Sequence, residues 1–349
     1  MRIAAAMSGG VDSSLAAALL AEQGHEVVGL FMQMVDPRDC GTLAPSDPTD
    51  AQRVADLLGI RLVVLDFRRE LEALIAYFCS QYDAGRTPNP CVLCNKWVKF
   101  GRLFAHARIW GAERLATGHY ARISRARGRW LLRRGRDRAK DQSYMLFGLE
   151  QAQLATALFP LGGMRKEDAR RMAKKRGLPV YRRKESQDVC FVPQGNHQAL
   201  LRERLRGRVQ PGPILDTAGN VLGQHPGCQC FTIGQRRGLR VAAGEPRYVV
   251  RIDREANAVV VGTREELRRG SIRVSEVNWV AFEAPPPSFR AGVQIRYNQE
   301  PVPARIEPLG GGQARVDFDT PVAGVPPGQA AVFYDGELVL GGGWIGPEP

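Results

Sequence analysis

The sequence contains no apolar run approaching the roughly 20 residues that a helix needs to cross a bilayer. It begins MRIAAAMSGG, in which Ser and Gly end the apolar run too early for a signal peptide. Its cysteines number seven, which is odd, and they lack the spacing of a disulfide framework. We therefore expect a cytoplasmic protein with no membrane partner.

Unusual composition is absent as well. The chain is 44% hydrophobic and 24% charged, which argues against a disordered protein, a collagen or a coiled coil. Its 349 residues are more than one compact core usually holds, so we expect two or three domains.

The positive charge is unevenly placed. The formal net charge is +13, yet residues 121–210 alone carry 23 basic and 8 acidic residues, and the rest of the chain is slightly acidic. Such a stretch predicts binding to a polyanion, of which nucleic acid is the commonest large one. The alternative is an Arg-rich solvated surface with no ligand.

The first 120 residues alternate between strand and helix patterns, which predicts a doubly wound parallel sheet of the α/β class. Between the helix expected at 70–82 and the one that ends near Trp110 we expect a loop rich in Pro and Cys at 87–95. The expected strands are 2–7, 25–34, 61–67 and 113–121, and the expected helices are 13–23, 49–59, 70–82 and a segment ending near Trp110.

The last third of the chain has a different sequence pattern. Short alternating segments are separated by turns such as Asp335–Gly336, a strong hairpin signal. We read two small β-rich units there, the second a barrel. The predicted domains are 1–202, whose part from 121 to 202 is basic, then 203–272 and 273–349.

The sharpest local motif is SGGVDSS at 8–14, directly between the first strand and the first helix. Gly9 and Gly10 allow a tight turn, and the helix N-terminus presents unpaired N–H groups that favour phosphate. Asp12 is placed to help hold Mg²⁺. No Gly-Lys-Ser/Thr follows, so the loop has no Walker A lysine, and it is not a GxGxxG motif either. The alternative is a Gly-rich turn with a Ser/Asp cap.

The cysteines suggest a second chemistry. Cys91 and Cys94 form a CxxC, and Cys190 lies far along the chain. Two of these thiols brought together would make a thiol–disulfide relay, whereas three would hold a metal or a cluster. Cys228 and Cys230 alternate on an expected strand, so we expect their side chains on opposite faces.

Several stretches together resemble one family, the bacterial tRNA-specific 2-thiouridylases of the MnmA type, which belong to the PP-loop ATP pyrophosphatases. The resemblance runs in order over nearly the whole chain. It rests on SGGVDSS (8–14), TPNPCVLCN (87–95), ATGHYAR (116–122), KDQSYMLF (140–147), SQDVCF (186–191), FTIGQRRGL (231–239) and GQAAVFYDGELVLGGGWI (328–345).

This resemblance implies a PP-loop (Rossmann-like) domain, a small central domain and a C-terminal β-barrel. It implies transfer of sulfur to the wobble uridine of tRNAs for Lys, Glu and Gln, with ATP, Mg²⁺ and a sulfur donor, which is a cysteine desulfurase or a relay protein. Cys94 matches the family's nucleophile and Cys190 its persulfide carrier.

Binding residues are carried over position by position. The ATP set comprises Ala6, Met7, Ser8, Gly9, Gly10, Val11, Asp12, Ser13, Met32 and Gly118. The base and tRNA set comprises Asn89, Pro90, Cys91, His119, Lys140, Asp141, Gln142, Arg296, Tyr297 and Gln329.

The chain departs from the family's pattern at two places. The loop after the second strand reads FMQMVDP (31–37) and lacks the Asn-Trp of many relatives, so the resemblance does not imply docking of the sulfur donor there. The second departure is at Cys91. Many members have Asp where this chain has Cys91, so a proposed acid/base carboxylate is missing. The departure favours an alternative chemistry for the same product, in which Cys91, Cys94 and Cys190 ligate a [4Fe–4S] cluster. A third interpretation is an RNA-binding module stapled by zinc and without catalysis.

Overall fold

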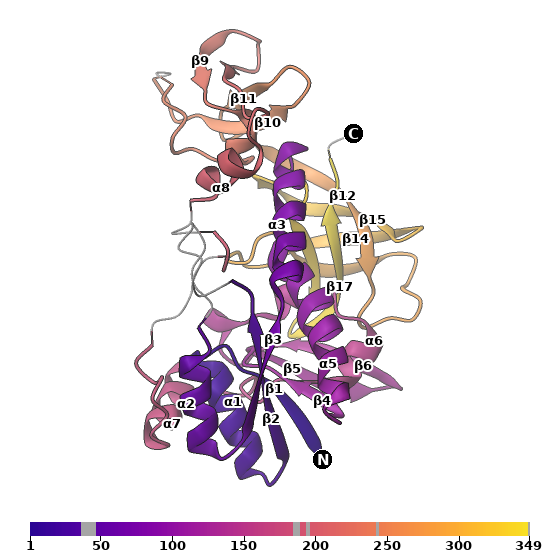
Figure 1. The fold of residues 1–349 in the computed structure, drawn as a ribbon. Coiled ribbons are helices and arrows are strands. Elements are labelled where there is room, and N and C mark those ends of the chain that lie inside the picture. Colours follow the sequence, from indigo (N-terminus) through magenta and orange to yellow (C-terminus); the bar gives the residue numbers. More distant parts are fainter. Residues whose placement is uncertain (36–46, 184–188, 193–195, 242–243, 348–349) are drawn as a thin grey trace.

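A computed structural model describes residues 1–35, 47–183, 189–192, 196–241 and 244–347. It contains three sheets (Figure 1). The long helix α3 runs from the parallel sheet, past the C-terminal barrel, to the central β-rich unit. The predicted fold class, an α/β domain followed by a β-rich unit and a barrel, is confirmed.

The first sheet is entirely parallel, as predicted. Alternate residues of its central strand enter two different cores, because successive side chains of a strand point to opposite faces. Ile3 and Ala5 pack with α1, α2 and α7, whereas Ala4 packs with α3 and α5. In spatial order the strands are β3 (Arg61–Asp66), β2 (Glu26–Gln33), β1 (Arg2–Ala6), β4 (Arg114–Ala116) and β7 (Ala157–Leu158).

The helices around this sheet follow most of the expected positions. They are α1 (Val11–Glu22), α2 (Thr49–Leu58), α3 (Arg68–Asp83), α4 (Pro90–Leu93), the π-helical segment Cys94–Leu103, α5 (Phe104–Ile109), α6 (Gln151–Thr156) and α7 (Lys166–Lys175). Helix α8 (His197–Arg204) lies instead beside the central β-rich unit (Figure 1).

The expected loop at 87–95 is wrong in its second half. Pro90 is the first residue of α4, and the helical path continues through Cys94 into the π-helical segment. A proline suits the first helical position, because its missing N–H is unneeded there and its φ is already helical. The residue type that suggested a loop therefore begins a helix, and both cysteines of the CxxC lie on it.

The expected strand 113–121 is also interrupted. Strand β4 ends at Ala116, and residues 117–119 leave the sheet before β5 (Ala121–Ala126) begins. Gly118 crosses the first turn of α1 so closely that a Cβ there would lie 2.8 Å from backbone atoms of Asp12 and Ser13.

The central unit is a four-stranded sheet, with β8 and β11 parallel and the other pairs antiparallel. Cys228–Cys230 form a 3₁₀ turn rather than the expected strand, and both side chains are buried in one core. Strand β9 ends at His225, and Gly227, with a φ of 155°, precedes the 3₁₀ turn. The strands are β10 (Tyr248–Asp253), β11 (Ala258–Gly262), β8 (Gly212–Leu215) and β9 (Val221–His225).

The third sheet closes into a six-stranded barrel through the pairing of β12 with β17, and the hairpin β5–β6 extends it. Strand β12 runs through residue 272, where we placed a domain boundary. The strands in order are β12 (Arg268–Asn278), β15 (Gln313–Ala323), β14 (Val302–Gly310), β13 (Phe289–Gln294), β16 (Ala330–Asp335), β17 (Leu338–Ile345), β6 (Arg129–Arg134) and β5 (Ala121–Ala126).

Strand β16 joins the barrel to the first domain. Ala331 and Phe333 fill the interior of the barrel, whereas Ala330, Val332 and Tyr334 belong to the core that α3 and α4 also build. The barrel and the α/β domain are therefore packed through one shared hydrophobic core.

Candidate functional site

The glycine-rich loop lies where the sequence predicted it, between β1 and α1. Gly9 has a φ of +71°, a conformation that favours glycine, and Gly10 caps α1. The Ser13 hydroxyl ties the turn together, since it accepts from the Ser8 amide at 3.2 Å and donates to the Gly10 carbonyl at 3.2 Å. The Ser14 hydroxyl is buried without a partner among the described residues, and an oxygen-rich ligand would satisfy it. The loop is thus shaped for a phosphate group.

The Asp12 carboxylate is bound from two other elements. The Lys166 ammonium lies 2.6 Å from Oδ2 and 2.8 Å from Oδ1, and the Tyr120 hydroxyl donates to Oδ1 at 2.9 Å. Lys166 is the first residue of α7 and is buried. Helix α7 therefore contributes directly to the loop.

The predicted ATP residues surround the carboxyl ends of β1, β2 and β4. Met7 donates its backbone N–H to Leu30 of β2, and Met32 on the same strand packs against the core beneath α3. Gly118 lies so close to the loop that a Cβ at this position would collide with Asp12. This edge of a parallel sheet is where ligands bind in doubly wound folds.

The three predicted thiols form a second group. Cys91 on α4 and Cys94 at the start of the π-helical segment are half-buried, Cys190 is exposed, and all three are free thiols. π-Helical turns inside helices are frequent at functional sites. The thiols are close enough for the charge on one to act on another.

The surroundings of the thiols raise their pKa values. Burial, followed by the charges of Cys94 and Cys190, raises the pKa of Cys91 to about 12. Burial also raises the pKa of Cys94. The pKa of Cys190 is raised by desolvation from the surrounding protein atoms and then by the charge of the nearby Cys94. The Lys99 ammonium opposes this effect at all three thiols by lowering their pKa.

Lys99 also connects the thiol helix to the end of β4. Its Nζ donates to Asn95 Oδ1 at 3.0 Å and lies 3.5 Å from His119 Nε2. Burial, followed by the charge of Lys99, holds the pKa of His119 well below its ordinary value, so this ring is neutral at pH 7. His119, predicted to contact tRNA, is therefore a buried neutral residue beside Lys99.

We tested whether the cysteines fit a metal or a cluster. Within the described ranges, no group of three or more His, Cys, Asp or Glu side chains is arranged to hold a metal ion. Cys91, Cys94 and Cys190 thus do not form a ligand set in this arrangement.

The predicted tRNA residues fall into two groups. Asp141 is buried, and its carboxylate accepts from Gly135 N at 2.9 Å and from Ser143 N at 3.0 Å. Gln142 accepts from the Tyr120 amide at 2.9 Å. Both side chains bind their own protein. Arg296 and Tyr297 are exposed, and Lys140 and Gln329 are partly exposed, as is Gln142.

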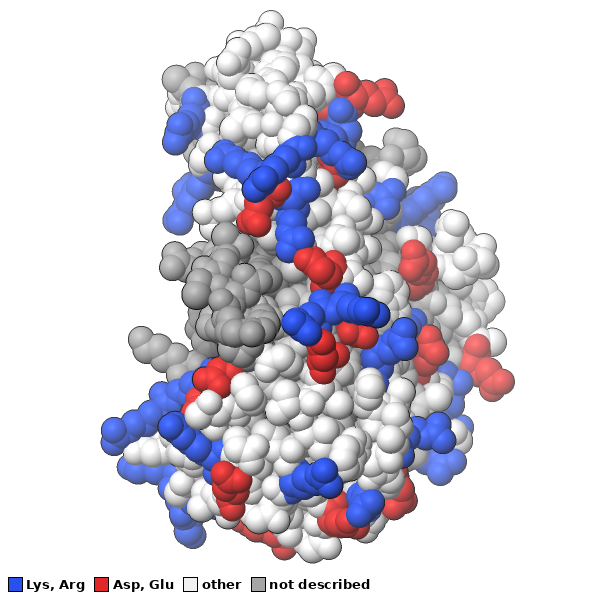
Figure 2. Space-filling view, viewed as in Figure 1, with Lys and Arg blue, Asp and Glu red and all other residues white. Residues whose placement is uncertain are grey.

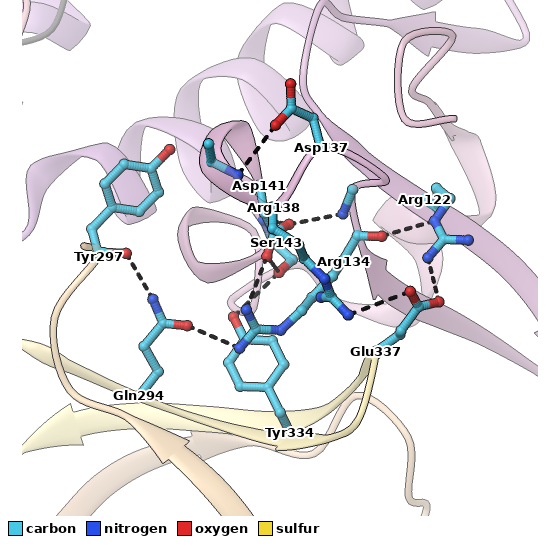
Figure 3. A network of polar contacts seen from close by, with 12 residues as sticks. Arg122, Arg134, Asp137, Arg138, Asp141, Ser143, Gln294, Tyr297, Tyr334 and Glu337 are labelled. Carbon is cyan, nitrogen blue, oxygen red and sulfur yellow. Dashed lines mark hydrogen bonds and ion pairs between the residues drawn. The ribbon is translucent and has the colours of Figure 1, made fainter. Parts of the chain in front are cut away.

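A polar network joins these positions across the domains (Figure 3). Arg134 pairs with Asp141 at 3.6 Å, lies over the Tyr334 ring at 3.8 Å from its centroid, and donates to Gln294 at 3.2 Å. Gln294 in turn donates to the Tyr297 carbonyl at 2.8 Å. The loop of Asp141 and the barrel loop of Tyr297 are held in a fixed relation.

Gln329 positions the thiol helix from the barrel. It donates to the Pro88 carbonyl at 3.3 Å, and the Thr87 amide donates to Pro327 at 2.7 Å. The segment leading into α4 therefore rests on a barrel loop. Asn89, two residues further on, is buried and donates to Met145 Sδ at 3.5 Å.

Basic side chains gather over α2 and α7, at the lower left of Figure 2, and over the central sheet at the top. Acidic side chains lie among them on the remainder of this face. Helix α7 supplies part of the first group with the sequence KEDARRMAKK. A membrane span is not among the described elements, because none of their helices is long and apolar enough.

Comparison with known proteins agrees with this geometry. Residues 1–194 match the family described as tRNA methyl transferase HUP domain, 198–263 its PRC-barrel domain, and 269–345 the aminomethyltransferase beta-barrel domain. The tRNA-specific 2-thiouridylase MnmA of Moorella thermoacetica is 47% identical, over 97% of this chain and 98% of its own. The chain belongs to the MnmA family of tRNA-specific 2-thiouridylases.

A second MnmA, from Chloroflexus aggregans, is 49% identical over 97% of each chain. Among solved structures, the U34-tRNA thiolase NcsA from Methanococcus maripaludis with its [4Fe-4S] cluster is 17% identical and covers 60% of this chain and 73% of its own. Its TM-score of 0.37 marks a distant likeness, which decides nothing about a cluster in this MnmA-family chain.

The sequence did not reveal several residues that complete the site of this family member. Lys99 carried no signal beyond its position five residues after Cys94, and Lys166 looked like one of many solvated charges on α7. Arg183, which donates to the Gly9 carbonyl at 3.0 Å and to Asp50 at 2.7 Å, lies in the basic stretch. Their roles depend on contacts between segments far apart in the chain.

Proposed function

We propose that this protein is a tRNA-uridine 2-sulfurtransferase that thiolates the wobble uridine of tRNAs for Lys, Glu and Gln and splits ATP into AMP and pyrophosphate. One observation carries the proposal. The adjacent residues Gly118 and His119 touch both halves of the site, since Gly118 lies against Asp12 of the phosphate loop and His119 contacts Lys99 beside the thiols. An activated uridine bound here would face both ATP and sulfur.

The chemistry requires ATP because the uridine C2 carbonyl is a poor electrophile. The O2 atom attacks the α-phosphorus of ATP, pyrophosphate leaves, and C2 then carries an adenylate that is a good leaving group. The loop amides at Gly9 and Gly10 and the N-terminus of α1 stabilise the departing pyrophosphate. Mg²⁺, when bound, supplies further neutralisation of the phosphate charge.

Sulfur enters through the thiols. A desulfurase or relay protein leaves a persulfide on Cys190, whose exposure makes it accessible to such a donor. The terminal sulfur attacks C2 and AMP leaves, which gives a Cys190–S–S–C2 adduct. The Cys94 thiolate attacks the Cys190 sulfur, so that the thiouracil leaves with the bonding electrons and a Cys94–Cys190 disulfide remains. A dithiol reductant then restores both thiols.

Lys99 assists this sequence by favouring the anionic form of the thiols, against the effect of burial. Cys91 is the least acidic of the three, with a pKa of about 12, and we assign it no step. It occupies the position of the Asp of other members, and in its protonated state it cannot replace a carboxylate.

The tRNA is held by the exposed basic surface, and its target base leaves the anticodon stack to reach the thiols. We assign the backbone contacts to Lys140, Arg296, Tyr297 and Gln329, which have accessible surface. Asp141 and Gln142 act by holding the loop of Lys140 in place, because their side chains bind Ser143 and Tyr120. Because the proposed substrate is tRNA, we propose that the enzyme works in the cytoplasm.

A thiolation assay with separate cysteine variants tests the proposal. The protein is purified anaerobically, its iron and acid-labile sulfide are measured, and it is supplied with ATP, unmodified tRNA, a cysteine desulfurase, cysteine and a dithiol. Nucleosides are then analysed by mass spectrometry. We expect 2-thiouridine with the wild type and with Cys91→Ser, and none with Cys94→Ser or Cys190→Ser.

Two outcomes would contradict this scheme. Iron near four atoms per chain together with an inactive Cys91→Ser would establish the cluster mechanism. An iron-free wild type that binds tRNA but releases no pyrophosphate would indicate a binding module without catalysis.

A further inference from the structure

The phosphate loop of this protein has no cation of its own. Between Ser8 and Ser14 there is no Lys or Arg, and Asp12 adds a negative charge where phosphates would lie. P-loop enzymes solve this problem with a lysine inside the loop. In this fold the only source of such a charge is another segment of the chain.

Lys166 provides an ammonium group at that place. Its Nζ lies 2.6 Å and 2.8 Å from the two oxygens of Asp12, the second residue of α1, whose first turn faces the phosphate site. Only 9% of its side chain is exposed, compared with 29% for Asp12. The ammonium is therefore held inside the protein at the edge of the loop, while the carboxylate keeps a solvent-facing side.

The position of Lys166 is unfavourable for the helix that carries it. It is the first residue of α7, where the helix dipole disfavours a positive charge, and burial of an ammonium group adds to the cost. Asp137 accepts from the Lys166 backbone amide at 2.9 Å and so fixes where the side chain begins. The local structure thus holds a cation at a place that helix stability alone would not select.

We propose that Lys166 is a phosphate-binding residue of the ATP site, which exchanges the Asp12 carboxylate for phosphate oxygens when nucleotide enters. The inference rests on the proposed function only in taking ATP as the ligand. In the free protein Lys166 and Asp12 neutralise each other. In the complex the ammonium contacts the triphosphate, and Asp12 remains hydrogen-bonded to the Tyr120 hydroxyl.

Binding of nucleotides without tRNA tests the proposal. Lys166→Met keeps the length of the side chain and removes its charge, and Lys174→Met removes a charge from the exposed face of the same helix. Affinities for ATP and for adenosine are measured by calorimetry on each full-length protein. We expect Lys166→Met to weaken ATP binding at least tenfold and to leave adenosine binding within twofold, and Lys174→Met to change neither.

A purely structural lysine would behave differently. Loss of the loop conformation would weaken ATP and adenosine alike, and that result would overturn the proposal, as would unchanged ATP affinity. If Lys166→Met does not fold, Lys166→Gln replaces it, because a neutral amide can still donate to Asp12. The same selective loss of ATP binding is expected there.

The test separates this inference from the proposed function. A wild type that binds ATP but yields no 2-thiouridine, with a selective loss in Lys166→Met, would refute the function and support the role of Lys166. A wild type that thiolates tRNA, with full ATP affinity in Lys166→Met, would support the proposed function and overturn the role of Lys166.

Discussion

The Lys99 ammonium lies 3.5 Å from Nε2 of His119, on the side of the ring opposite the Thr117 hydroxyl, which is 2.7 Å from Nδ1. An ammonium group has no lone pair, so Nε2 must accept and the proton of the neutral ring is on Nδ1. His119 then donates to Thr117. This assignment fixes the tautomer of a residue that touches the thiol helix.

We expect acid to destabilise the protein through His119. Its folded pKa lies well below the ordinary value, so protonation is favoured in the unfolded chain. Above the unfolded pKa of about 6.5 the ring is neutral in both the folded and the unfolded state, so it does not affect stability. Below that pH the unfolded chain takes up a proton that the folded protein does not, and the free energy of unfolding falls by up to ~1.4 kcal/mol per pH unit. Urea unfolding at pH 7.5 and 5.5 measures the effect. The pH dependence should be smaller in His119→Gln, and an identical dependence would contradict the assignment.

We expect Lys99→Met to make Cys94 and Cys190 less acidic, because Lys99 lowers the pKa of both thiols. The rate of alkylation by iodoacetamide, followed for each peptide by mass spectrometry, should rise at higher pH than in the wild type. Lys96→Met is the control, since that side chain pairs with Glu150 at 2.9 Å. Superimposable profiles for Lys99→Met and the wild type would show that Lys99 does not act on the thiols.

Gly342→Ala should destabilise the protein by ~1–3 kcal/mol, the usual cost of overpacking. A Cβ at this position of β17 would lie 2.8 Å from the Phe147 ring and from the Ala331 carbonyl, so the barrel and the first domain would both have to move. Gly270→Ala in β12 has open space around its Cβ and should change the free energy of unfolding little. Equal effects in urea titrations would argue against close packing at β17.

Replacing two charged residues of the network in Figure 3 should lower the free energy of unfolding by different amounts. Arg134 is buried, so Arg134→Met removes the partner of buried Asp141 and should cost ~3 kcal/mol or more. Glu337 bridges Arg122 and Arg138 at the surface, so Glu337→Gln should cost only ~0–1 kcal/mol. Chemical denaturation measures the free energy of unfolding of both variants. A larger loss in Glu337→Gln than in Arg134→Met would mean that the surface ion pairs of Glu337 hold the two domains together.

The parallel sheet and the phosphate loop were predictable because their signals are local. Strand periodicity, Gly9–Gly10 and the following helix are adjacent in the chain, so one window of sequence contains the whole feature. The barrel was predictable for a similar reason, since hairpin turns such as Asp335–Gly336 mark it.

The completed site was not predictable from local patterns. Lys166 meets Asp12 across more than 150 residues, and nothing in its helix distinguishes it from its solvated neighbours. Proline before the CxxC gave the wrong answer, because Pro90 suits a helix start as well as a loop. Asp141 looked like a tRNA contact by resemblance, and only its bonds to Gly135 and Ser143 place it inside.

Strand β16 has one further consequence, for how the molecule unfolds. Its alternating residues build two cores at once, so separation of the barrel would expose Ala330, Val332 and Tyr334 to water together with their partners in the α/β domain. The barrel and the nucleotide domain are therefore one cooperative unit, in which neither part reaches its full stability alone. A chain that stopped before residue 330 would lose part of the hydrophobic core against which α4, the helix of Cys91, packs.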